Sequence, residues 1–216
     1  GIATAGCSRA RPGVSYDERP WELRRRPGVV IETEHCLIHS TVTDAVFCRA
    51  AATLAERLHE ELQRDLGFEP KGKTLCYVFA DRPDWEAFTR RLTNTPPDQP
   101  LQIRAEGYTT RDRCVVRYTR RLATLTVLAH ELVHAYLAGA SDRPVPVWLS
   151  EGLATLYEAQ DWPDDEPRFT PEKNLFRRDA LARALANRTL YPLEELLSIR
   201  SEDVYRESHV RVRTYY

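Results

Sequence analysis

The sequence contains no methionine, so it has no initiator residue. We therefore expect the 216-residue chain to be a trimmed part of a longer translation product. It stops at Tyr216, directly after a segment that still has the pattern of a structured element, which predicts truncation at the C-terminus. The length suits one large domain, or one domain with a helical extension.

Cysteine pairs of the CxxC type are also lacking. The five cysteines are widely separated, which argues against a cysteine zinc site or a dithiol redox motif. Cys36, Cys76 and Cys114 lie in apolar, strand-like runs, where we expect small buried hydrophobic side chains. One disulfide is compatible with this pattern if the protein is exported.

Cys7 has a different setting. It follows the small residues Thr4, Ala5 and Gly6, a pattern typical of the end of a bacterial lipoprotein signal, and a polar tether with arginine and proline comes after it. The sequence lacks the apolar region that should lie upstream, so a chance match or a cloning remnant is the alternative. The pattern predicts a candidate lipid anchor at Cys7, and a protein that is secreted or held at the bacterial cell envelope.

A strong charge of one sign is absent, since the formal net charge is −1. This argues against a nucleic-acid partner held by bulk electrostatics, and no nucleic-acid partner is expected. An unbroken apolar run is lacking too. The most apolar stretch, residues 122–139, carries two histidines and a glutamate near its centre, which a bilayer would not tolerate cheaply. No transmembrane helix is therefore predicted.

The order of the predicted elements indicates an α+β fold. Residues 1–28 are rich in Arg, Pro and Gly without a sustained period, which predicts a flexible N-terminal arm, and residues 29–216 are expected to form one domain. Asp44 should cap a long helix that Gly67 ends. Strands are expected within 29–39, 74–79, 101–109 and 113–118, and helices at 44–66, 81–92, 122–138, 146–160, 172–187 and 192–206. An N-terminal mixed sheet with helices thus precedes a buried helix and a C-terminal helical part.

The main chemical signal is the motif His130-Glu131-Leu132-Val133-His134. Residues four apart project from one face of a helix, so both imidazoles can reach one metal ion. Glu131 points about 100° around the axis, where it can hold a water molecule instead of ligating the same ion. Zinc held by two nitrogens and one carboxylate lowers the pKa of a bound water to about 7, and a neighbouring carboxylate can take the proton. We therefore expect one zinc ion, with Glu131 as general base.

The helix that carries this motif is predicted to be buried, because residues 122–129 are apolar on nearly every side. Two histidines and a glutamate on a buried helix are costly unless they have partners. A metal ion would supply that partner. The alternative is a set of core polar residues that are satisfied without a metal.

Glu151 is the expected third ligand. Sixteen residues separate it from His134, and they include a turn marked by Pro144 and Pro146, so the chain can reverse and return across the first helix. Gly152 is expected to let the two helix backbones approach closely. The alternative for Glu151 is an exposed acid at a helix N-terminus, stabilised by the helix dipole.

These two segments together resemble the gluzincin branch of zinc metallopeptidases. The motif at 130–134, followed by Val-Pro-Val-Trp-Leu-Ser-Glu-Gly-Leu-Ala at 145–154, is similar to the peptidase MA-like family of bacterial secreted and surface proteins. The preceding layout of strand, long helix, strand and a turn at 106–109 is similar as well, so the likeness covers about residues 29–160. The rival metzincin pattern needs a methionine turn, and a glycine and a histidine where this chain has Leu137 and Ala140.

The resemblance implies a zincin-like fold in which a peptide or protein substrate binds along a sheet edge. It implies zinc held by His130, His134 and Glu151, with Glu131 as base. It also implies that a tyrosine or histidine from a later helix stabilises the oxyanion. The candidates for that role are Tyr205, His209, Tyr215 and Tyr216. The Gly-x-Met-Glu-Asn motif of aminopeptidases is missing, which argues against trimming of peptide N-termini.

Three functions are compatible with the sequence. The first is a zinc metallopeptidase of the gluzincin type. The second is a zinc-stabilised binding or assembly module on the cell surface that cleaves nothing. Glu131 argues against it, because a structural metal site has no need of that carboxylate. The third is a hydrolase of small amides or esters.

Overall fold

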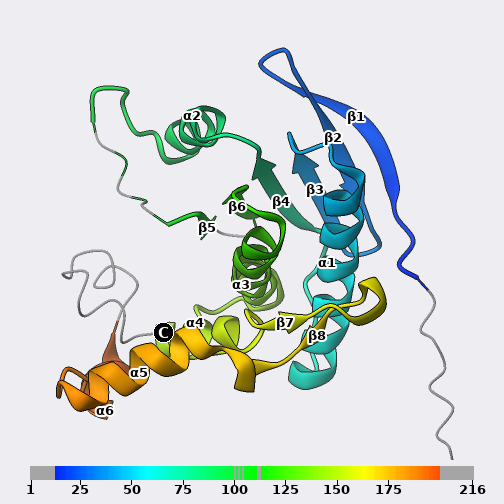
Figure 1. The fold of residues 1–216 in the computed structure, drawn as a ribbon. Helices are drawn as coiled ribbons and strands as arrows, with labels where there is room; N and C mark the ends of the chain where they lie inside the picture. The colour runs from blue at the N-terminus through cyan, green and yellow to red at the C-terminus, as the bar shows by residue number, and fades with distance from the viewer. Residues whose placement is uncertain (1–12, 100, 102, 104, 111–112, 200–216) are drawn as a thin grey trace, which may run out of the picture.

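The computed structural model describes residues 13–99, 101, 103, 105–110 and 113–199. These residues form a six-stranded mixed sheet in the order β1-β2-β3-β4-β6-β5 (Figure 1). The inner pairs β3–β4 and β4–β6 are parallel, and the outer pairs are antiparallel. The strands are β1 (Asp17–Leu23), β2 (Arg26–Glu32), β3 (Cys36–Ser40), β4 (Thr74–Phe79), β5 (Gly107–Thr110) and β6 (Arg113–Arg117).

The N-terminal arm predicted for residues 1–28 is wrong from residue 17 onward. Residues 17–32 form the hairpin of β1 and β2, so order begins before Val29. Arg24 and Arg25 make its two-residue turn, with φ of 50° and 66°, the positive values that such a turn requires. β1 is an exposed, charged edge strand held by its backbone, so it lacks the apolar alternation that would have revealed it.

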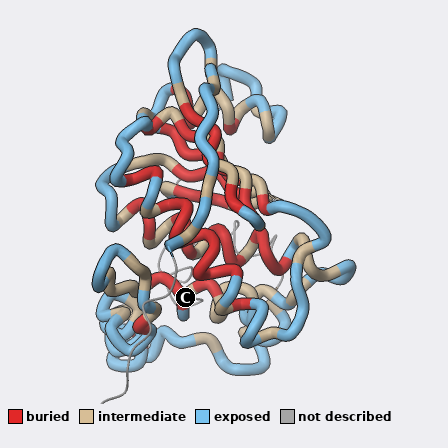
Figure 2. Tube along the Cα trace, turned by 90° about the vertical axis from the view of Figure 1, so that its right-hand side faces the viewer, coloured by how far each residue is buried: buried red, intermediate tan, exposed pale blue. Residues whose placement is uncertain are grey.

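Two helices cover one face of the sheet and make the main core with it. They are α1 (Ala45–Leu66) and α3 (Arg121–Ala140), and their apolar side chains pack together with those of β2, β3, β4 and β6. The predicted ends of α1 are confirmed, because the Asp44 side chain accepts a hydrogen bond from Phe47 N and Gly67 takes φ 73°. Figure 2 shows the buried residues gathered in the middle of the molecule, between exposed loops.

The other face of the sheet carries α2 (Arg82–Thr93). Trp85 of this helix packs with Phe79, Tyr108 and Val115 in a second, smaller cluster. α3 is long and apolar enough to cross a membrane by length and composition, but it is mostly buried inside the protein. Its burial is that of a core helix, packed beside α1 and against β4, β5 and β6.

The C-terminal part is helical, as predicted, with different bounds. α4 (Val147–Leu156) is shorter than expected, and the chain then forms a small hairpin of β7 (Gln160–Asp161) and β8 (Arg168–Phe169). α5 (Leu175–Ala186) and α6 (Leu193–Ser198) follow, after single 3-10 turns at Pro163–Asp165 and Pro171–Lys173. The α+β class expected from the sequence is confirmed. The predicted segment 200–206 lies outside the described residues.

Candidate metal centre

His130 and His134 project from one face of α3, one turn apart. Their Nε2 atoms lie 3.0 Å from each other. Two nitrogen ligands at about 2.0–2.1 Å on a tetrahedral zinc ion would be about 3.3 Å apart, so a small adjustment of these side chains fits that geometry. The helical spacing in the sequence therefore produces the convergence that a single ion needs.

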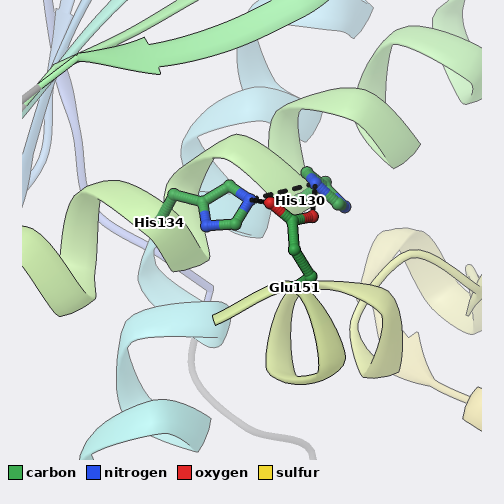
Figure 3. A group of neighbouring side chains, drawn as sticks. All are labelled: His130, His134 and Glu151. Atoms are coloured by element: carbon green, nitrogen blue, oxygen red, sulfur yellow. Dashed lines mark hydrogen bonds and ion pairs between the residues drawn. The ribbon is translucent and has the colours of Figure 1, made fainter. Parts of the chain in front are cut away.

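Glu151 comes from α4, which packs against α3. Its Oε2 lies 3.4 Å from His130 Nε2, and its Oε1 lies 3.5 Å from His134 Nε2. Figure 3 shows the three side chains pointing toward one another from the two helices. Donor atoms of all three lie within 4.8 Å of one another. The structure thus brings together the three candidate ligands that the sequence singled out.

The far side of each imidazole ring has its own partner. His134 Nδ1 lies 2.8 Å from Ser150 Oγ, and His130 Nδ1 lies 2.8 Å from Glu158 Oε1. A partner on Nδ1 fixes the orientation of the ring and directs Nε2 toward the cluster. Both rings are therefore held in the orientation that metal binding requires.

Glu158 is a buried carboxylate that the sequence did not single out. Arg177 of α5 donates to both of its oxygens, from Nε to Oε2 at 2.8 Å and from Nη2 to Oε1 at 2.5 Å, and Asn174 Nδ2 donates to Oε2 at 3.0 Å. Burial raises the pKa of Glu158, but the hydrogen bonds from Arg177 and His130 outweigh burial and lower it to about 2. Glu158 is thus a fixed anion behind His130. In the sequence, the position of Glu158 seven residues after Glu151 gives only a weak indication that the two lie at the same site, because α4 ends between them.

Glu131 lies on the neighbouring side of α3, toward β5. Thr109 Oγ1 of β5 lies 2.7 Å from Glu131 Oε2 and 2.9 Å from the Glu131 backbone oxygen, so its hydroxyl can donate to either. Burial raises the pKa of Glu131, and the two histidines and Thr109 oppose this only in part. The Glu131 carboxylate is thus next to His130, His134 and Glu151 but is not a member of that group of candidate metal ligands.

The strand next to Glu131 comes unusually close to α3. A Cβ at Gly107 would lie 2.5 Å from Val127 Cγ1 and 2.9 Å from Glu131 Cγ, so this position requires glycine. The close approach expected at Gly152 is wrong, since a Cβ there would meet nothing within 4 Å. The glycine that a close approach to α3 requires is therefore Gly107 of β5.

The charges of the cluster suit a cation. Burial lowers the pKa of His130, but the carboxylates of Glu151 and Glu158 outweigh burial and raise it to about 9. Burial likewise raises the pKa of Glu151, and the two imidazoles outweigh it and lower it to about 2. Glu151 Oε2 is buried and has no hydrogen-bond partner among the described residues. Two imidazole nitrogens and a carboxylate, one of whose oxygens is buried without a hydrogen-bond partner, form a set of ligand atoms that fits a divalent ion such as zinc.

A second group of possible ligands lies elsewhere, at Glu34, His35 and Glu56. Here the His35 backbone N–H donates to Glu56 Oε1 at 2.9 Å, and His35 Nδ1 lies 2.7 Å from Glu56 Oε2. Both carboxylate oxygens are therefore occupied in holding the turn between β2 and β3. The hydrogen bonds between His35 and Glu56 thus explain why these side chains lie together without a metal ion.

The remaining predicted site residues lie outside the described part of the chain. They are Cys7, Tyr205, His209, Tyr215 and Tyr216. No family model, no curated protein and no solved structure matches this chain.

Proposed function

We propose that this chain is a zinc metallopeptidase of the gluzincin type with a zincin-like fold. The observation that carries the proposal is the convergence of His130 Nε2, His134 Nε2 and the Glu151 carboxylate, with Glu131 beside them on α3. A site that merely stabilised the fold would need a filled coordination sphere. In the part of the chain that the structure describes, three candidate donors and an adjacent buried carboxylate come together, which is the composition of a hydrolytic site.

Each residue has a distinct task in this proposal. His130, His134 and Glu151 would hold the ion, which supplies a Lewis acid that polarises the substrate carbonyl and acidifies water. Ser150 and Glu158 keep the imidazoles oriented. Glu131 takes a proton from the attacking water and passes it to the leaving amine. Thr109 holds the Glu131 carboxylate in place from β5.

The substrate proposed is a peptide or protein. Among the described residues β5 is the outer strand of the sheet at the site, so an extended peptide that paired with its outer edge would reach Glu131. A secreted or envelope location, with a lipid anchor at Cys7, stays part of the proposal.

The test combines metal analysis with a library of quenched peptides. We expect about one zinc per chain in the wild type and in Glu131→Gln, and we expect His134→Ala to lose the metal. Cleavage should fall by roughly 10²–10⁴-fold in Glu131→Gln, the usual contribution of a general base. Glu194→Gln, at an exposed position of α6, is the matched control and should cleave normally.

Other results would select the alternatives. Equal cleavage by wild type and Glu131→Gln would reject the proposed base. Bound zinc without turnover of any peptide, together with a loss of thermal stability on chelation, would favour a binding or assembly module. Turnover of small esters or amides alone would favour the third function.

A further inference from the structure

Two cysteines face each other in the centre of the sheet. Cys76 of β4 and Cys114 of β6 are directly paired in the parallel register of these strands. Both side chains are fully buried in the main core, on the face that α1 and α3 cover. Their Sγ atoms lie 2.7 Å apart.

This arrangement meets the geometric needs of a disulfide. Paired strands lie about 4.7–4.9 Å apart, which falls within the Cα separation of about 4.4–6.8 Å that a disulfide spans. Ordinary non-bonded contacts between carbon atoms are about 3.5–4.0 Å, and sulfur is larger. A separation of 2.7 Å is therefore shorter than the ordinary contact distance between two unbonded thiols. A small rotation of the two side chains would bring the sulfur atoms to the S–S bond length of about 2.05 Å. We propose that Cys76 and Cys114 form a structural disulfide when the protein folds in an oxidising compartment.

The bond would tie together the part of the fold that positions Glu131. The two cysteines are 38 residues apart, and the chain between them contains α2 and β5 (Figure 1). β5 pairs with β6 and brings Gly107 and Thr109 against α3. A covalent link from β6 to β4 fixes this edge of the sheet to its centre.

The chemistry is a thiol–disulfide exchange with an oxidant that is itself a disulfide, such as an oxidoreductase or oxidised glutathione. One cysteine thiolate attacks the oxidant, which releases a thiol and leaves a mixed disulfide. The second cysteine then attacks the mixed disulfide and releases the other thiol. The two cysteines lose two electrons and two protons, and the oxidant gains them as its S–S bond breaks.

Burial determines when this step takes place. Both thiols are 0% exposed, so an oxidant reaches them before the core closes. Cys36 lies in the same core, but its partner on β4 is Thr74, which places it diagonal to Cys76. Diagonal neighbours on paired strands are about 7–8 Å apart, beyond the reach of a disulfide. The register therefore selects Cys114 as the partner of Cys76.

The bond can be found by mass spectrometry of the whole chain, expressed once with export to a bacterial periplasm and once in a reducing cytosol. Each preparation is unfolded, alkylated without reduction and digested with trypsin. From the exported protein we expect peptide 74–90 joined to peptide 114–117, lighter than the two reduced peptides by two hydrogens. Cys36 and Cys48 should carry the alkyl label. Alkylated Cys76 and Cys114 in the exported protein, or a bond from Cys76 to Cys36, would overturn the proposal.

Thermal unfolding tests the effect of the bond on the same two preparations, both kept in the same chelator so that metal makes no difference. A loop of this length predicts a melting temperature roughly 8–16 °C higher for the exported protein. Cys114→Ala should melt at one temperature from both sources, whereas Cys48→Ala, also in the core, should keep the difference. Equal melting temperatures for the two wild-type preparations would overturn the stabilising role. This inference is independent of the proposed peptidase activity, because neither readout depends on zinc or on cleavage.

Discussion

Replacing Gly107 by alanine tests the contact between β5 and the helix that carries Glu131. The new methyl group would lie 2.5 Å from Val127 Cγ1 and 2.9 Å from Glu131 Cγ. Ordinary contact needs about 3.5 Å, so the strand and the helix must separate by about 1 Å. Overpacking of this kind costs about 1–3 kcal/mol of the free energy of unfolding.

The same displacement should reduce catalysis more than metal binding. Thr109 lies two residues after Gly107 and donates to Glu131, so the proposed base moves with the strand. A misplacement of about 1 Å in a catalytic site can lower the rate by about 10²-fold. We expect kcat/KM on a cleaved peptide to fall by that order while the zinc content stays at one per chain, because the three proposed ligands come from α3 and α4.

Gly152→Ala is the matched control for this experiment. Its Cβ would meet nothing within 4 Å, and the position lies inside α4, where alanine is favoured over glycine by about 0.8–1.0 kcal/mol. Urea unfolding should therefore show a stabilised Gly152→Ala and a destabilised Gly107→Ala. If Gly107→Ala were as stable and as active as the wild type, the proposed tight contact between β5 and α3 would be refuted.

Two further predictions concern the metal and the response to acid. Glu158→Gln removes the negative charge beside His130 Nδ1 and should weaken zinc binding by about 10–100-fold, measured in competition with a chelator. An unchanged zinc affinity would mean that the Glu158 carboxylate does not act on His130. Burial lowers the pKa of His59 in the folded protein, so the unfolded chain binds a proton more tightly and stability is lost as the pH falls below about 6.5. The free energy of unfolding of wild type relative to His59→Gln should therefore decrease between pH 7.5 and pH 5, by up to about 1.4 kcal/mol per pH unit, and a pH-independent difference would contradict this.

Several features were predictable because they depend on neighbours along the chain. The cap at Asp44 and the left-handed Gly67 define α1 through local hydrogen bonds and backbone freedom. The four-residue spacing of His130 and His134 guarantees a shared face wherever the helix lies. The hairpin at residues 17–32 escaped prediction, because its turn uses two arginines at positive φ where glycine or asparagine is the usual signal.

The sequence by itself determined the α+β class, the bounds of the long helix α1 and the identity of the three candidate ligands. Tertiary structure decided which side chains support them: Glu158 with Arg177 behind one imidazole, Ser150 behind the other, and Thr109 beside Glu131. It also decided that Gly107, and not Gly152, allows the close approach, and that Cys76 faces Cys114. The physical reason is that helix periodicity and capping act over a few residues, whereas strand register and the packing of distant elements depend on the whole chain.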